Sequence, residues 1–141
     1  PAVGLDESSQ MLYYARNRLP AGNSRLVRGI GQAIPFETGY FHHVTATFPA
    51  PYIFEQSTLN EIRRVLKPGG NLIILLTAEV TGNSFHERII RFFSGMLGFG
   101  YLPESLQESL QNHFRDAGFL ARVECISGGN ARLLIIIGQP V

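Results

Sequence analysis

The segment TLNEIRRVLKPGGNLIILL, residues 58–76, carries two elements of secondary structure in a fixed order. Its first half places apolar side chains at helical spacing, and Thr58 and Glu61 have the spacing of a capping box. The KPGG run at residues 67–70 holds the proline and glycines that end helices. The aliphatic run that follows predicts a strand covered on both faces, as in a parallel sheet between helices. A helix followed at once by a buried strand favours an α/β layer fold.

Toward the amino terminus, the hydrophobic period alternates between strand and helix. A helix is predicted to begin behind the candidate N-caps Ser8 and Ser9. The glycines and the proline of residues 29–36 predict a loop. The segments that read as strands are residues 1–6, 26–27 and 41–48. This order is the alternation that a parallel sheet with helical crossovers requires.

Toward the carboxyl terminus, we predict two helices and a hairpin. Residues 84–97 repeat the capping-box spacing and carry one apolar face, which we interpret as core packing; a lid or a membrane-surface element is the alternative. A second helix begins at Pro103 and ends before Gly118 in the C′ position. Residues 120–126 and 132–137 are strand-like runs joined by a Ser-Gly-Gly-Asn loop, so an antiparallel strand should finish the sheet.

The overall composition excludes several classes of protein. The chain has 141 residues, 45% of them hydrophobic, and a formal net charge of +1, so we predict one domain over residues 1–141. The near-zero charge argues against a nucleic-acid partner, whose binding depends on neutralising phosphates. No apolar run is long enough to span a membrane, and no secretion signal opens the chain. The lone Cys125 fits a reducing compartment, so we expect a cytoplasmic protein.

Four stretches together resemble a known family. They are VGLD at residues 3–6, the loop at 29–36, NEIRRVLKPGG at 60–70, and AGF at 117–119 with the hairpin after it. Over nearly the whole chain they resemble a class I S-adenosylmethionine-dependent methyltransferase of the small-molecule type. The resemblance implies a Rossmann-like α/β sheet in the order 3-2-1-4-5-7-6, mostly parallel, with strand 7 antiparallel as the C-terminal hairpin strand.

The first β-α unit of that family has no counterpart in these residues. Strand 1 and its glycine-rich turn should come before the acidic position matched by Asp6, and only five residues precede it. A βαβ unit takes about 30 residues or more. We therefore expect a methyltransferase domain truncated at its amino terminus, whose 141-residue chain alone is inactive. A central gap with unpaired backbone groups would favour a homodimer or a strand exchange if the chain is complete as given.

The resemblance also suggests where the complete domain would bind S-adenosylmethionine. Asp6 ends a strand, where a carboxylate can accept two hydrogen bonds from a ribose diol; capping the next helix is the alternative. Ile30, Gly31 and Gln32 would lie along the adenine, although Ile30 stands where the family commonly has an acidic residue. For the Gly29-Ile30-Gly31 run itself, a plain turn is the alternative interpretation.

Thr47 and Phe48 are the other two predicted cofactor residues, because they end the strand beside which such enzymes place the transferring methyl group and the substrate. A structural loop is the alternative for both residues. His42 stands where the family usually has Asp, and the adjacent His42 and His43 point to opposite faces of a strand, so we predict no metal site. No catalytic residue is assigned, because methyl transfer from an activated sulfonium requires mainly positioning.

The leading interpretation is therefore the C-terminal portion of a methyltransferase catalytic domain that acts on a small-molecule acceptor. The alternative is a non-catalytic association module that has lost cofactor binding, which Ile30 and His42 at usually acidic positions favour. A nicotinamide-binding fold is a third interpretation, and the hairpin and residues 67–70 suit it less well.

Overall fold

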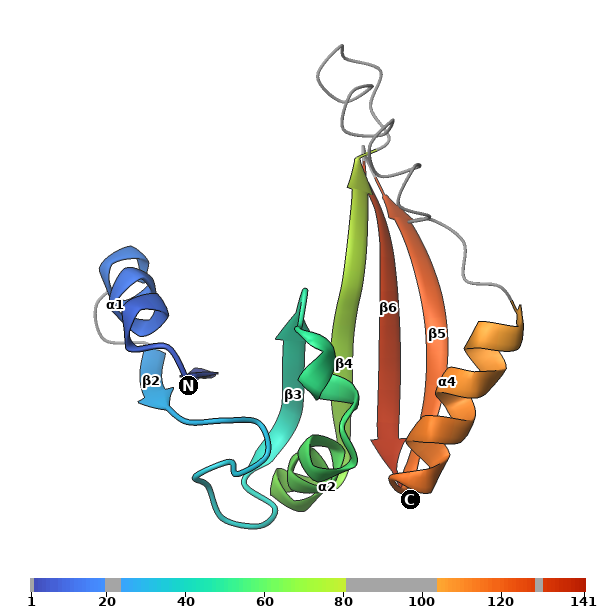
Figure 1. Cartoon of the computed structure of the whole chain (residues 1–141), viewed down its shortest axis with the longest axis horizontal. Helices are drawn as coiled ribbons and strands as arrows, with labels where there is room; N and C mark the ends of the chain where they lie inside the picture. The colour runs from blue at the N-terminus through green and yellow to red at the C-terminus, as the bar shows by residue number, and fades with distance from the viewer. Residues whose placement is uncertain (1, 20–23, 81–103, 129–130) are drawn as a thin grey trace.

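The computed structural model describes residues 2–19, 24–80, 104–128 and 131–141 (Figure 1). The predicted helix at residues 84–97 lies outside these ranges. Along the chain, the described elements are β1 (Ala2–Asp6), α1 (Ser9–Arg18), β2 (Ser24–Arg28), β3 (Phe41–Thr47), the 3-10 helix η1 (Pro51–Phe54), α2 (Gln56–Val65), β4 (Leu66–Val80), α4 (Glu104–Asp116), β5 (Phe119–Gly128) and β6 (Ala131–Pro140).

The strands form two sheets. β1 and β2 pair in parallel, from Ala2 with Ser24 to Asp6 with Arg28. The larger sheet has the order β3-β4-β6-β5, in which β3 and β4 are parallel and β6 is antiparallel to both of its neighbours (Figure 1). The predicted mixed α/β fold with an antiparallel C-terminal strand is confirmed. The sheets β2-β1 and β3-β4-β6-β5 correspond to strands 3-2 and 4-5-7-6 of the order that the family resemblance implies. No described strand pairs with both β1 and β3.

Local signals place the first helix where the sequence predicts it. Ser8 is the N-cap of α1, and its hydroxyl oxygen accepts a hydrogen bond from the backbone N–H of Met11 at 3.3 Å. At the other end of the chain, Gly118 takes the left-handed conformation after α4, with φ +78°. Both assignments follow from capping chemistry alone.

The predicted capping box at Thr58 and Glu61 is wrong. Helix α2 begins at Gln56, its N-cap is Glu55, and no side-chain hydrogen bond caps it. Thr58 therefore lies inside the helix and is 1% exposed, while the carboxylate of Glu61 binds Arg64 and the N–H of Ile34. The capping box does not form because the Glu61 carboxylate binds the charged guanidinium of Arg64 more strongly than it would bind a backbone N–H at the start of the helix.

Residues 67–70, which are predicted to end the helix, lie within β4 and interrupt its pairing with β3. Leu66 pairs with Phe41, and the next pair is Asn71 with His43, so these residues form an irregularity within the strand. A Cβ atom on Gly70 would lie 2.7 Å from the carbonyl oxygen of His42. The close approach of two backbones explains why glycine stands here.

Gly70→Ala is expected to lower the free energy of unfolding by roughly 3 kcal/mol, because the backbone atoms that it meets cannot rotate away. Gly39→Ala is the matched control: its φ is +67°, but a Cβ there meets nothing within 4 Å, so only the left-handed conformation is penalised, at about 1–2 kcal/mol. Urea unfolding measures both. Equal losses would contradict the steric explanation.

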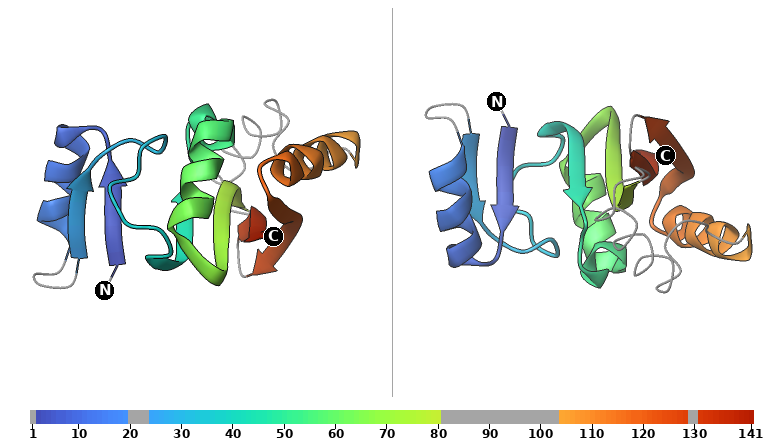
Figure 2. Two further views of the ribbon diagram at one scale, coloured as in Figure 1. Left: turned by 90° about the horizontal axis from the view of Figure 1, so that it is seen from below. Right: turned by 90° about the horizontal axis from the view of Figure 1, so that it is seen from above.

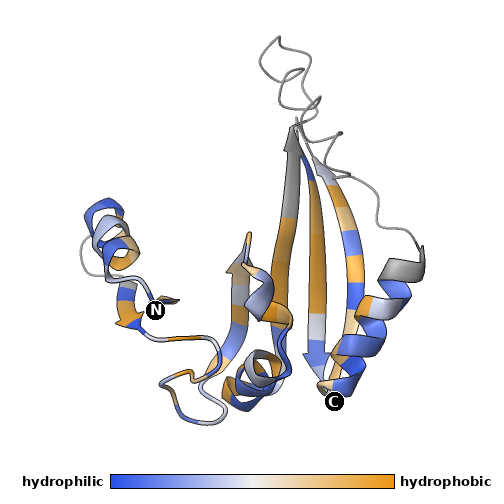
Figure 3. Ribbon diagram, in the orientation of Figure 1, coloured by the Kyte–Doolittle hydropathy of each residue, from blue (hydrophilic) through white to orange (hydrophobic). Residues whose placement is uncertain are grey.

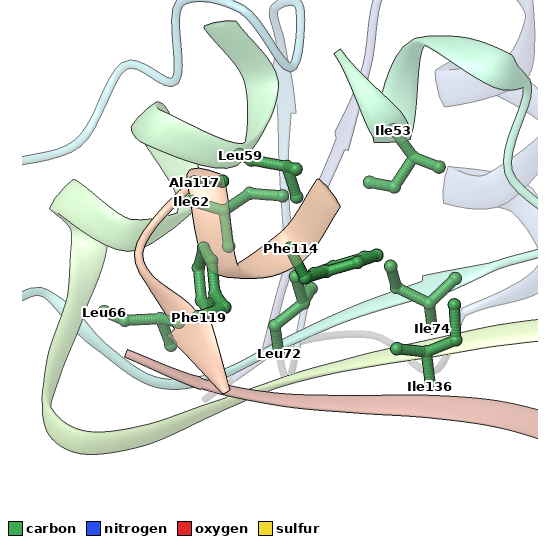
Figure 4. Packing of buried hydrophobic residues seen from close by; sticks show 10 residues of the cluster. All are labelled: Ile53, Leu59, Ile62, Leu66, Leu72, Ile74, Phe114, Ala117, Phe119 and Ile136. Carbon is green, nitrogen blue, oxygen red and sulfur yellow. The ribbon is translucent and has the colours of Figure 1, made fainter. Parts of the chain in front are cut away.

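The core lies on the face of the larger sheet that α2 and α4 cover (Figures 2 and 4). Leu72 and Ile74 of β4 point into it and are fully buried, whereas Ile73 and Leu75, which alternate with them, are only partly buried. Coverage of this strand on both faces is thus incomplete among the described residues. Apolar colouring runs along β4 and β6 at the centre of the sheet (Figure 3). The buried cluster comprises Ile53, Leu59, Ile62, Leu66, Leu72, Ile74, Phe114, Ala117, Phe119 and Ile136.

Candidate functional site

A cleft of about 1540 Å³ lies between β1 and β3. Residues Ala2 to Asp6 of β1 line it from one side and residues Phe41 to Ala46 of β3 from the other. The loop after β2 and the first turns of α2 contribute further lining residues. The cleft therefore joins the end of β1 to the loop that the sequence predicts as a cofactor contact.

Four of the six predicted cofactor residues line this cleft: Asp6, Ile30, Gly31 and Gln32. They come from two segments that are separated in the sequence and meet where β1 and β2 end, since the N–H of Gly29 donates to the carbonyl oxygen of Asp6 at 3.1 Å. Thr47 and Phe48 lie at the end of β3, directly after the lining residues of that strand.

Asp6 has a local partner as well as a place in the cleft. Its Oδ1 accepts a hydrogen bond from the backbone N–H of Ser8 at 2.8 Å. A carboxylate has two oxygens and about four sites for accepting hydrogen bonds. The contact that holds the start of α1 therefore leaves the carboxylate with capacity for a second donor.

The loop after β2 packs on the start of α2. A Cβ on Gly31 would lie 3.0 Å from Cγ2 of Thr58 and 3.2 Å from Cε2 of Tyr52, so the loop backbone approaches both side chains closely. Nε2 of Gln32 donates to Oε2 of Glu55 at 3.0 Å. Ile30 stays 44% exposed in the cleft, which leaves an apolar surface free for a flat ring.

Thr58 is a site residue that the sequence interpretation misplaced. It lines the cleft, yet its Oγ1 is buried and has no hydrogen-bond partner among the described residues. The sequence offered no separate signal, because a threonine before a helical apolar stripe is more often a cap. A buried hydroxyl without a partner lowers stability.

Thr58→Val is expected to raise the free energy of unfolding by about 1–2 kcal/mol, because a methyl group of similar size replaces the unsatisfied hydroxyl. Thermal and urea unfolding measure the change, and Thr45→Val, at an exposed position on β3, serves as the control with a change below about 0.5 kcal/mol. A loss of stability in the Thr58 variant would indicate that the hydroxyl has a partner.

Phe48 has an unusual backbone. Its φ is +49°, which makes it the non-glycine residue with positive φ among the described ranges. The backbone N–H of Phe48 donates to the carbonyl oxygen of Leu75 at 2.9 Å, and its side chain is 62% exposed. A bulky residue in the left-handed region is strained, and such strain concentrates at functional sites.

Glu61 and Arg64 bind the loop after β2 from α2. Nε and Nη2 of Arg64 each donate to one carboxylate oxygen of Glu61 at 2.7 Å. Nη1 donates to the carbonyl oxygen of Phe36 at 2.7 Å, and Nη2 donates to that of Ile34 at 2.9 Å. Oε2 of Glu61 accepts from the N–H of Ile34, also at 2.9 Å.

This arrangement shifts the pKa of Glu61 and the pKa of Arg64. The hydrogen bonds from Arg64 lower the pKa of the Glu61 carboxyl against the opposing effect of burial, and the Ile34 N–H adds to the lowering. The same contact raises the pKa of Arg64. The pair is therefore an ion pair at neutral pH. Its i, i+3 spacing is a sequence signal for it that the capping-box interpretation overlooked.

Metal and membrane features can be stated for the described ranges only. No group of three or more His, Cys, Asp or Glu side chains is placed there to hold a metal ion. His42 and His43 are both exposed, and Nε2 of His42 lies 3.4 Å from Nζ of Lys67. None of the described helices is long and apolar enough to cross a membrane.

Comparison with known proteins identifies the family of the chain. A family model described as a methyltransferase domain matches residues 1–74. The demethylmenaquinone methyltransferase of Thermus thermophilus is 31% identical over 151 residues, which cover 93% of this chain and 69% of that protein. Across several such relatives, the chain spans 59 to 69% of their length.

Two solved structures show the same architecture. The antibiotic-resistance methyltransferase Kmr matches with a TM-score of 0.65 at 25% identity, over 99% of this chain and 74% of that one. A SAM-dependent methyltransferase from Methanosarcina mazei matches with a TM-score of 0.61 at 16% identity, over 99% and 82%. The resemblance predicted from the sequence is confirmed: the chain belongs to the class I S-adenosylmethionine-dependent methyltransferases.

Proposed function

We propose that the protein methylates a small-molecule acceptor and that demethylmenaquinone is the first acceptor to test. The observation that supports the proposal most directly is that Asp6 and the loop with Ile30, Gly31 and Gln32 meet where β1 and β2 end, with the N–H of Gly29 donating to the carbonyl oxygen of Asp6 at 3.1 Å. The named relatives at 31% identity supply the acceptor. Demethylmenaquinone is an apolar quinone.

The cleft residues fit the cofactor by their chemistry. The Asp6 carboxylate would accept from the ribose hydroxyls, as acidic groups at the ends of strands do for nucleosides. Ile30 would pack on the adenine ring, and Gly31 would keep the backbone of the loop close to α2. S-adenosylmethionine supplies an activated methyl group, so no general base is assigned to the described residues.

Thr47 and Phe48 are proposed to contact the acceptor at the end of β3. The exposed ring of Phe48 and its strained backbone support this assignment. An aromatic side chain can stack on a quinone through an offset arrangement.

The decisive experiment is made on the protein as its gene encodes it. Calorimetry measures S-adenosylmethionine binding, and transfer of a tritiated methyl group to demethylmenaquinone measures activity. We expect both binding and transfer. Binding without transfer would exclude this acceptor.

A second candidate function is the association module, which Ile30 favours because it removes a polar adenine contact. Absence of S-adenosylmethionine binding by the gene product would support that function instead. In that case we expect β1 and β3 to pair with a strand of another copy, since both line the cleft and neither pairs across it among the described strands. Sedimentation would then show a dimer.

A further inference from the structure

The connection between the two sheets is residues 29–40. β1 and β2 pair with each other, and β3 pairs with β4, so no ladder of the described strands fixes the position of this connection. Gly29 is bound to the carbonyl oxygen of Asp6, Gln32 is bound to Glu55, and Ile34 packs against the buried cluster.

The further hydrogen bonds of the segment are to α2. Glu61 and Arg64 make hydrogen bonds with Ile34, and the Arg64 side chain also donates to Phe36. The N–H of Gly39 donates to the backbone carbonyl oxygen of Arg64 at 2.9 Å.

The held segment is joined directly to the adenine contact proposed above. Ile30 and Ala33 form a β-bridge, with the N–H of Ala33 donating to the carbonyl oxygen of Ile30 at 3.2 Å. Residues 30–33 are therefore a closed turn, and Ile34 follows it immediately. A displacement of Ile34 relative to α2 would move the turn as a unit.

We propose that Glu61 and Arg64 are positioning residues for the cofactor: from α2 they hold the loop so that Ile30, Gly31 and Gln32 face the cleft at the correct distance from Asp6. The inference rests on the proposed placement of the adenine along this loop. It assigns a role to two side chains that do not themselves need to touch the cofactor.

The expected magnitudes separate positioning from a role in stability alone. The side chains of Arg64 and Glu61 remain 33% and 23% exposed, so the ion pair alone contributes only about 0–1 kcal/mol to folding, and the hydrogen bonds of Arg64 to the carbonyl oxygens of Phe36 and Ile34 add a modest further amount. A displacement of about 1 Å at a binding site, in contrast, can reduce function by about a hundredfold. Loss of the pair should therefore affect cofactor binding far more than unfolding.

The test uses Arg64→Lys and Arg64→Ala in the protein as its gene encodes it. Lysine keeps the charge but cannot form the bidentate fork, so both variants lose the geometry. We expect the dissociation constant for S-adenosylmethionine to rise at least about tenfold in both, under conditions in which both variants remain folded. Amide hydrogen exchange at Ile34 and Phe36 should become faster.

Two control variants are needed, one for the loss of an ion pair and one for the loss of stability. Arg122→Ala breaks the exposed ion pair with Glu124 on β5, at the far edge of the sheet from β3, and should leave cofactor affinity unchanged. Phe119→Leu destabilises the core from β5, where the ring of Phe119 meets that of Phe114 on α4. It should lower the urea midpoint while the folded protein binds the cofactor normally.

Unchanged affinity in the Arg64 variants, with normal binding by the unaltered protein, would overturn this inference and leave the proposed function intact. An equal loss of affinity in Phe119→Leu would also overturn it, because general loosening would then explain the result. Failure of the unaltered protein to bind S-adenosylmethionine would overturn both. If Arg64→Ala does not fold, Arg64→Lys and Glu61→Gln carry the same test.

Discussion

Replacing Phe114 with alanine is expected to lower the free energy of unfolding by about 3–5 kcal/mol, the range for truncating a buried aromatic residue. Phe114 is completely buried, and its ring meets those of Phe54 and Phe119 edge to face at centroid distances of 6.2 and 6.4 Å. The side chain thus joins η1, α4 and β5. Because domains are stable by only about 5–15 kcal/mol, the variant should lose a large fraction of the stability of the fold.

Urea unfolding followed by circular dichroism measures this loss. Phe114→Leu, which leaves a smaller cavity, should lose less, and Leu120→Ala, at a position that is 56% exposed, should change stability by about 0.5 kcal/mol or less. A loss below about 1.5 kcal/mol in Phe114→Ala would mean that α4 does not depend on this side chain for docking.

Asp6→Ala is expected to weaken S-adenosylmethionine binding by about 10- to 100-fold. Hydrogen bonds to a charged group contribute about 1.5–3 kcal/mol, and each 1.4 kcal/mol is a factor of ten in affinity. The same variant also loses the acceptor for the N–H of Ser8, so the start of α1 is weakened. Calorimetry with the protein as its gene encodes it measures the affinity.

Asp6→Asn separates these two roles. The amide oxygen can still accept from Ser8, but the group is neutral and binds ribose hydroxyls less strongly. We expect Asp6→Asn to keep wild-type stability and to lose most of the affinity that Asp6→Ala loses. If affinity follows stability in both variants, Asp6 only caps the helix, which is the alternative that the sequence left open.

The fold was predictable from residues whose conformation is decided locally. Ser8 caps a helix, Gly118 ends one, and the strand-like runs of residues 120–126 and 132–137 pair as β5 and β6, as local patterns predict. Thr58 and Glu61 were misassigned because Glu61 pairs instead with Arg64, three residues further on, and with the N–H of Ile34, which reaches it only after the loop has folded back on α2. Thr58 itself has no hydrogen-bond partner among the described residues.

The candidate site was predictable where the family resemblance supplied a position, as for Asp6, Ile30, Gly31 and Gln32. No periodicity shows that these residues line a common cleft, because the cleft depends on the spacing of β1 and β3. The strained backbone of Phe48 and the unsatisfied hydroxyl of Thr58 are likewise properties of packing. Local sequence does not encode such properties in any readable form.

The position of β6 between β4 and β5 has a consequence for the order of folding. β5 and β6 are consecutive and pair up to Gly128 and Ala131, so their hairpin closes a very short loop and can form within roughly 1–10 μs. Pairing β6 with β4 must close a much longer loop that includes α4, at a greater entropic cost. We therefore expect the hairpin to nucleate the larger sheet, so that substitutions within it slow refolding and those in β1 or β2 mainly accelerate unfolding.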